Sequence, residues 1–195
     1  MKETEITVEV LDTLENVMQI LSNQGFLLIK ERNMYDWYYS KSSIQDIKSM
    51  AYPEMIANSF LVRRIVDDKD LKMLTFKKKE LDNVGNVIAE EKVECKLENI
   101  DSALEIFDAA GLTCWANIHQ RMLIYGKGNV EFAVQIVDGL GIFIEYEEDE
   151  SMAGMDEYAK IELMASTLDQ IGLKLGSDLS CKKVYLQFAK KYDSK

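Results

Sequence analysis

Short segments in which apolar residues alternate with mainly charged ones limit the fold of this chain more than any other feature. In ETEITVEV the two sets are Glu3, Glu5, Thr7 and Glu9 against Ile6, Val8 and Val10. In GIFIEYEEDE they are Ile142, Ile144 and Tyr146 against Phe143, Glu145 and Glu147. Successive side chains of a β-strand point to opposite faces, so a period of two predicts strands. Each of these strands would have one apolar face and one acidic face.

Further segments predict about eight strands and about four helices in all. The other expected strands are LLIKERNMYDWYYSK, NSFLVRRIV, LKMLTFKKKE, VECK, ANIHQRMLIY and NVEFAVQIV. The expected helices lie near residues 14–24, 44–50, 100–110 and 161–171, and CKKVYLQFAKK is a short helix or a strand. The first helix carries an apolar stripe of Leu14, Val17, Met18 and Leu21. Strands and helices on this scale indicate an α+β fold.

Charged faces on so many strands have two possible explanations. One is an antiparallel sheet with a solvated outer face. The other is a closed sheet whose charged face lines a wet tunnel while helices cover the apolar outside. Closure would also remove exposed strand edges.

The chain shows the same order of elements twice. A strand followed by a helix that ends at Gly25 is matched later by a strand followed by a helix that ends at Gly111. We therefore predict one domain over residues 1–195, built from two similar halves of about 1–88 and 89–195.

Composition excludes several classes of partner. The chain has 195 residues, a formal net charge of -11 and 47% hydrophobic residues. A protein with this negative net charge repels nucleic-acid backbones, because proteins bind these backbones mainly through Lys and Arg. The sequence contains no apolar stretch long enough for a membrane span. Three widely spaced cysteines, Cys95, Cys114 and Cys181, suggest neither a disulfide framework nor a zinc site. We expect a cytoplasmic protein, monomeric or homodimeric.

The segments, taken in order, resemble the CYTH family of triphosphate tunnel proteins, which includes class IV adenylyl cyclases, thiamine triphosphatases and inorganic triphosphatases. ETEIT resembles the ExExK strand, FLVRRI the LRxRxx strand, LTFK the LTxK strand and HQRMLIY the KxRxxY stretch. NVEFAVQIVDGLGIFIEYE is similar to VExxxDxxxGLGxFxExE. Lys183 and Tyr185 resemble the terminal KSY. The resemblance implies an eight-stranded antiparallel tunnel barrel with flanking helices.

The resemblance also implies a site. The candidate substrate-binding cations are Arg63, Lys77, Arg121 and Lys183, and the alternative is that they are solvated strand charges. The candidate ligands of Mg²⁺ or Mn²⁺ are Glu3, Glu5, Glu145 and Glu147, which Glu94 and Glu131 could extend. The acidic run Glu148 to Glu150 is expected to be solvated. No residue is singled out as a catalytic acid or base.

The implied function is metal-dependent cleavage of a triphosphate or nucleotide, as a triphosphatase or an adenylyl cyclase-like enzyme. Three positions depart from the family pattern: Thr7 replaces a lysine, Leu61 an arginine and Gln135 an aspartate. Each departure removes a charge from phosphate or metal binding. The alternative is therefore a non-catalytic relative that binds a phosphorylated or other anionic ligand.

Overall fold

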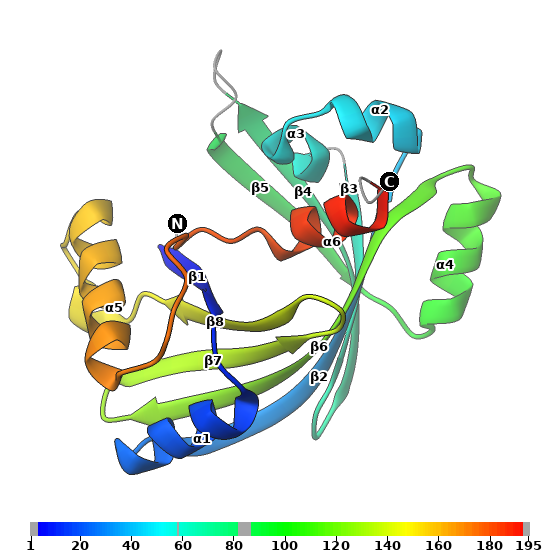
Figure 1. The fold of residues 1–195 in the computed structure, drawn as a ribbon. Helices are drawn as coiled ribbons and strands as arrows, with labels where there is room; N and C mark the ends of the chain where they lie inside the picture. Colours follow the sequence, from blue (N-terminus) through cyan, green and yellow to red (C-terminus); the bar gives the residue numbers. More distant parts are fainter. Residues whose placement is uncertain (1–3, 58, 82–86, 193–195) are drawn as a thin grey trace. The chain divides into compact units, whose positions relative to one another are not determined.

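The computed structural model describes residues 4–57, 59–81 and 87–192. Its strands are β1 (Glu5–Val10), β2 (Leu27–Ser40), β3 (Ser59–Val66), β4 (Asp70–Leu81), β5 (Val87–Lys96), β6 (Thr113–Lys127), β7 (Val130–Val137) and β8 (Gly141–Glu147). Its helices are α1 (Leu14–Asn23), α2 (Ile44–Ser49), α3 (Tyr52–Ala57), α4 (Ile100–Ala109), the 3-10 turn η1 (Glu150–Met152), α5 (Glu157–Ile171) and α6 (Lys183–Tyr192). Figure 1 shows their course.

The strands form one eight-stranded sheet in the order β1-β8-β7-β6-β2-β3-β4-β5. The pairs β1·β8, β7·β8, β6·β7, β2·β3, β3·β4 and β4·β5 are all antiparallel. The predicted α+β class and the eight strands are confirmed. Closure into a barrel stays a prediction, as does the division into repeats. Each half does have a strand, a helix and three further strands in that order, with α2 and α3 inserted between β2 and β3 in the first half.

The chain forms two compact units. The first unit contains residues 1–32 and 120–183, and the second contains 33–119 and 184–195. The long strands β2 and β6 each contribute residues to both units.

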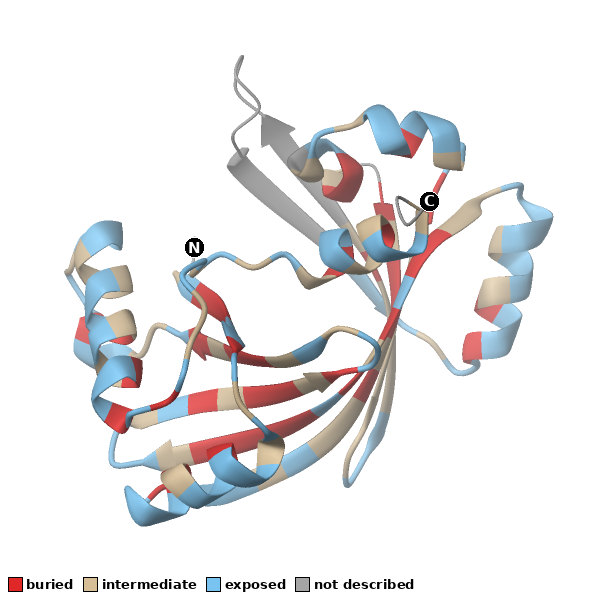
Figure 2. Ribbon diagram, in the orientation of Figure 1, coloured by how far each residue is buried: buried red, intermediate tan, exposed pale blue. Residues whose placement is uncertain are grey.

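In the first unit, one face of the sheet is apolar and two helices cover it. The core contains Ile6 and Val8 of β1 together with Val17 of α1 and Met164 and Leu168 of α5. Both helices begin at side-chain caps, Thr13 for α1 and Asp156 for α5, as such residues favour. Figure 2 shows buried positions along the strands of this unit. The polar residues of β1 and β8 are consequently left on the opposite face.

The second unit has aromatic side chains on both sheet faces. The Trp115 side chain is completely buried, and its ring contacts Tyr38 and Phe188 of α6. On the other face, Phe107 of α4 packs against Tyr39 and Phe60. The last segment is therefore a helix, which settles the alternative left open for it.

Two details differ from the sequence expectations. The helix α3 was not among the expected helices, and it begins one residue before Pro53. Proline is tolerated in the first helical turn because the N–H it lacks has no partner there. Met18 is 41% exposed, so it does not belong to the core stripe of α1. The cysteines Cys95, Cys114 and Cys181 are free thiols. None of the helices in the described residues could span a lipid bilayer.

Candidate functional site

The carboxylates predicted on β1 and β8 share one face of the first unit. In the register of these strands, Glu5 lies opposite Glu147 and Thr7 lies opposite Glu145. Their neighbours Ile6 and Tyr146 are buried on the other face. The predicted pairing of Glu5 with the β8 glutamates is thus present in the strand register. Glu3 lies outside the described residues.

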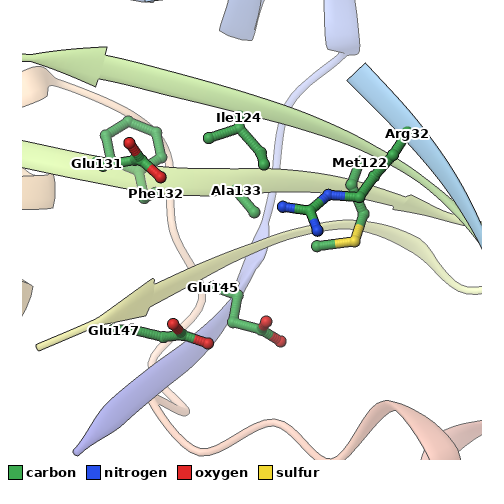
Figure 3. A pocket seen from close by; sticks show the side chains of 8 residues that line it. All are labelled: Arg32, Met122, Ile124, Glu131, Phe132, Ala133, Glu145 and Glu147. Carbon is green, nitrogen blue, oxygen red and sulfur yellow. The ribbon is translucent and has the colours of Figure 1, made fainter. Parts of the chain in front are cut away.

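This face contains a cavity of about 100 Å³. It is lined by Arg32 of β2, Met122 and Ile124 of β6, Glu131, Phe132 and Ala133 of β7, and Glu145 and Glu147 of β8. Figure 3 shows the Arg32 guanidinium and the three glutamate carboxylates around the same space. Glu131, suggested as an extension of the metal site, therefore joins Glu145 and Glu147 at one cavity.

Arg32 was not among the predicted site residues. Its Nε atom is buried and has no hydrogen-bond partner among the described residues. A buried guanidinium nitrogen without a partner is costly, because desolvation is not compensated by a hydrogen bond. An anionic ligand would supply the missing acceptor. The signal available in the sequence was the alternation of Lys30, Glu31 and Arg32, which puts the two bases on one face.

Lys183 reaches the site from the far end of the chain. The segment before it pairs with β1: the Thr7 N–H donates to the Leu179 carbonyl, and the Cys181 N–H donates to the Thr7 carbonyl, both at 2.9 Å. This places the Lys183 Nζ 2.7 Å from Oε2 of Glu145. The ammonium also donates to the side-chain oxygen of Gln135, which is completely buried. A predicted cation and a predicted metal ligand are thus brought together as an ion pair.

Arg63 lies in the second unit and forms an ion pair with Asp36. Its Nε donates to Oδ1 at 2.7 Å and its Nη2 to Oδ2 at 2.6 Å. Glu94 accepts a hydrogen bond from Thr75 at 3.1 Å on an adjoining strand pair. Lys77 belongs to β4, where its backbone pairs with that of Lys92. The Lys77 side chain lies outside the described part of the structure.

Arg121 lies on the face of β6 that Leu123 and Tyr125 occupy, and these two belong to the core under α1. Its Nε donates to Oε1 of Glu31 at 2.7 Å. This hydrogen bond lowers the pKa of Glu31 and raises that of Arg121. The structure does not bring Arg121 to the cavity of Arg32 and Glu145, because these line the opposite face of the sheet.

The run Glu148 to Glu150 was expected to be solvated, but Glu148 is paired with other parts of the fold. Its Oε2 lies 2.6 Å from Nζ of Lys160 and accepts the Thr4 backbone N–H at 3.0 Å. The hydrogen bonds from Lys160 and Thr4 lower the Glu148 pKa to about 2. Glu148 therefore ties the end of β8 to α5 and to the residue before β1, immediately beside the carboxylate face.

Within the described residues, no three His, Cys, Asp or Glu side chains are grouped closely enough to form a complete metal site. A complete protein cage is not what Mg²⁺ requires. Mg²⁺ is usually held by one or two carboxylates together with water and substrate phosphates. Glu145 and Glu147 at one cavity fit that ligand set.

Comparison with known proteins supports the fold and gives one functional lead. No family model matches the chain. A Methanocaldococcus jannaschii protein named "putative adenylate cyclase" is 28% identical over 188 residues, which is 96% of this chain and 98% of the relative. A solved Pyrococcus horikoshii OT3 protein has a TM-score of 0.63 at 17% identity, covering 95% of this chain and 99% of its own. A Vibrio parahaemolyticus structure named "putative adenylate cyclase" has a TM-score of 0.56 at 16% identity, covering 94% and 97%. These structures share the fold of an eight-stranded antiparallel sheet with flanking helices.

Proposed function

We propose that this chain binds a triphosphate-containing small molecule with Mg²⁺ or Mn²⁺ and cleaves it, as a CYTH-type triphosphatase or an adenylyl cyclase-like enzyme. The observation that carries the proposal is the buried Arg32 Nε without a partner, at a cavity that Glu131, Glu145 and Glu147 also line. A cation and several carboxylates around one cavity suit an anion that brings a metal ion with it. The name of the Methanocaldococcus jannaschii relative agrees with a nucleotide triphosphate.

Arg32 and Lys183 are the cations proposed to hold the phosphates in the first unit. A guanidinium grips two phosphate oxygens in a fork, whereas an ammonium acts as a point charge. The Lys183 side chain is only 15% exposed, so its interaction with a phosphate would be screened less than at the surface. Arg63, Lys77 and Arg121 stay predictions from the family resemblance, and Arg121 does not line this cavity.

Glu145 and Glu147 are the residues proposed to hold the metal ion, with Glu5 opposite Glu147 on β1. A divalent cation at this position would neutralise charge on the phosphate oxygens. In hydrolysis, water attacks the terminal phosphorus and the departing diphosphate oxygen keeps the electron pair of the broken P–O bond. In cyclisation, the ribose 3′ hydroxyl attacks the α-phosphorus and pyrophosphate leaves. In either reaction, Arg32 and Lys183 orient the chain of phosphates and stabilise the charge that develops on its oxygens.

The test is to incubate the purified protein with tripolyphosphate, thiamine triphosphate or ATP, with Mg²⁺ or Mn²⁺, and to measure phosphate, pyrophosphate and cyclic AMP. We expect turnover of at least one substrate. Glu147→Gln should reduce its kcat by about 100-fold or more, and Arg32→Gln should reduce kcat/KM by about 100-fold, as for other lost transition-state contacts. Arg64→Gln is the matched arginine control, because Arg64 is exposed and paired with Asp70.

Thermal stabilisation by each ligand separates the two candidate functions. The non-catalytic alternative is favoured by the pairing of Glu145 with Lys183, which occupies a carboxylate that a metal would need. If tripolyphosphate raises Tm and Arg32→Gln abolishes that rise, but nothing is turned over, the chain is an anion-binding relative. If no triphosphate raises Tm or is turned over, binding at this cavity is refuted.

A further inference from the structure

Lys183 is held beside the cavity-lining Glu145 by two backbone hydrogen bonds of the segment that precedes it and by two contacts of its ammonium. The backbone bonds of Thr7 to Leu179 and Cys181 fix the segment that precedes it. The ammonium lies 2.7 Å from the Glu145 carboxylate and also donates to Gln135. The exposed fractions are 15% for the lysine side chain and 23% for the glutamate side chain. The pair is therefore partly buried and is held from both sides, unlike a fully exposed surface contact.

An ammonium at this distance uses the same carboxylate oxygen that a divalent cation would need. The two cations repel each other, and at this degree of burial like charges a few ångströms apart are strongly unfavourable. The carboxylate cannot bind a metal ion fully while Lys183 stays in place. An anion in the cavity changes this balance, because phosphate oxygens offer Lys183 another partner.

We infer that Lys183 makes metal binding at this site depend on the phosphate ligand: it blocks Glu145 until an oligophosphate draws its ammonium away. Gln135 acts as the positioning residue, because its buried amide oxygen holds the ammonium beside Glu145. This inference rests on the proposed function. The site would then bind metal and triphosphate together, and would have little affinity for the metal alone.

Binding linkage makes the inference measurable without turnover. If the oligophosphate raises the metal affinity by some factor, the metal raises the oligophosphate affinity by the same factor. Couplings of this kind are typically about 5- to 150-fold. Removing the ammonium should therefore tighten metal binding to the protein alone and weaken oligophosphate binding in the absence of metal.

The experiment measures Mn²⁺ binding to the full-length protein by electron paramagnetic resonance, and tripolyphosphate binding in metal-free buffer by calorimetry. Lys183→Met keeps the length and packing of the side chain and removes its charge. We expect its Mn²⁺ affinity to rise about tenfold and its tripolyphosphate affinity to fall about tenfold. The neighbouring exposed Lys182 gives the matched control Lys182→Met, which should behave as the wild type.

Two further variants test whether the gain in Mn²⁺ affinity depends on Glu145 and on the loss of the positive charge at position 183. In Lys183→Met combined with Glu145→Gln, the gain in Mn²⁺ affinity should disappear, because Glu145 is the ligand that was set free. Lys183→Arg keeps the positive charge and should bind Mn²⁺ as weakly as the wild type, and it remains informative if Lys183→Met does not fold.

The outcomes distinguish this inference from the proposed function. If the wild type binds Mn²⁺ and tripolyphosphate but Lys183→Met has unchanged Mn²⁺ affinity, the blocking role is refuted and the proposed function stands. The same conclusion follows if Lys183→Arg binds Mn²⁺ tightly. If the wild type binds neither Mn²⁺ nor tripolyphosphate, separately or together, the proposed function itself is refuted.

Discussion

In the ion pair between Arg63 and Asp36, the carboxylate is buried but the guanidinium is partly exposed to water. Removing one partner should therefore not cost the same stability as removing the other. The Asp36 side chain is 4% exposed, whereas that of Arg63 is 33% exposed. Two short hydrogen bonds join them. If Arg63 is removed, a buried carboxylate loses its partner and cannot reach water. If Asp36 is removed, the guanidinium can still turn towards solvent.

This difference predicts unequal costs for the two substitutions. Breaking a fully buried pair costs about 3–5 kcal/mol, and the partial exposure of Arg63 reduces that figure. We expect Arg63→Met to lower the free energy of unfolding by about 2–3 kcal/mol. Asp36→Asn should lower it by only about 1 kcal/mol, because an amide can still accept one hydrogen bond. The double variant should cost less than the sum of the two single variants.

Arg64 and Asp70 provide a control with the same bonding pattern on the same strand. Their bonds are 2.8 and 3.1 Å long, but the side chains are 43% and 39% exposed. Such exposed pairs contribute about 0–1 kcal/mol, so Arg64→Met should have little effect. Urea unfolding followed by circular dichroism gives all of these values. Equal costs for Arg63→Met and Arg64→Met, or a larger cost for Asp36→Asn than for Arg63→Met, would refute the reasoning.

Two other contacts give predictions about stability. The Glu148 pKa is lowered from its ordinary value of 4.5 to about 2, so its contribution to stability is present above pH 4.5 and is lost as the pH falls towards 2. Lys160→Met should reduce this loss, measured as the slope of the urea midpoint against pH, and an unchanged slope would contradict the assignment. The Trp115 indole N–H donates to Oγ of Ser59 at 2.9 Å, and Ser59→Ala leaves this buried donor unsatisfied. We expect a cost of about 1–3 kcal/mol in urea unfolding, and a cost near zero would show that another acceptor replaces the hydroxyl.

The strands could be predicted where the residue pattern of a single segment distinguishes the buried face from the polar face. In β1 and β8 an apolar set alternates with a mainly acidic one, in which Thr7 and Phe143 are the exceptions, so the period of two also indicates which side is buried. The helices were predictable where a cap marks their start, as Thr13 does for α1. The apolar stripe of α1 was predicted to be wider than it is. Met18, at an i+4 position, lies at the edge of the buried face of the helix.

The helix α3 and the final helix α6 show where local patterns stop being decisive. A proline in the first turn of a helix and a proline in a loop give the same sequence signal, so YPEMIA did not predict α3. In the last segment, Val184 and Phe188 are the buried positions of α6, four residues apart. A segment this short matches both a helical and a strand pattern until its packing against Trp115 is known.

Arg32 and Arg121 show what the sequence could decide about the site and what it could not. On β6, the period of two separates Arg121 from Met122 and Ile124, but both parities of this stretch are apolar, so the pattern alone does not tell which one lines the cavity. The family resemblance, which matches residue types in order, contains no information about that face. On β2, residues 27–29 are three consecutive apolar residues, so the sequence of this end of the strand does not tell which parity faces the cavity. Only the arrangement of the strands in the folded unit puts Arg32 at the cavity with Glu145 and Glu147. An arginine on a strand without a clear apolar face is therefore the kind of site residue that sequence reasoning overlooks.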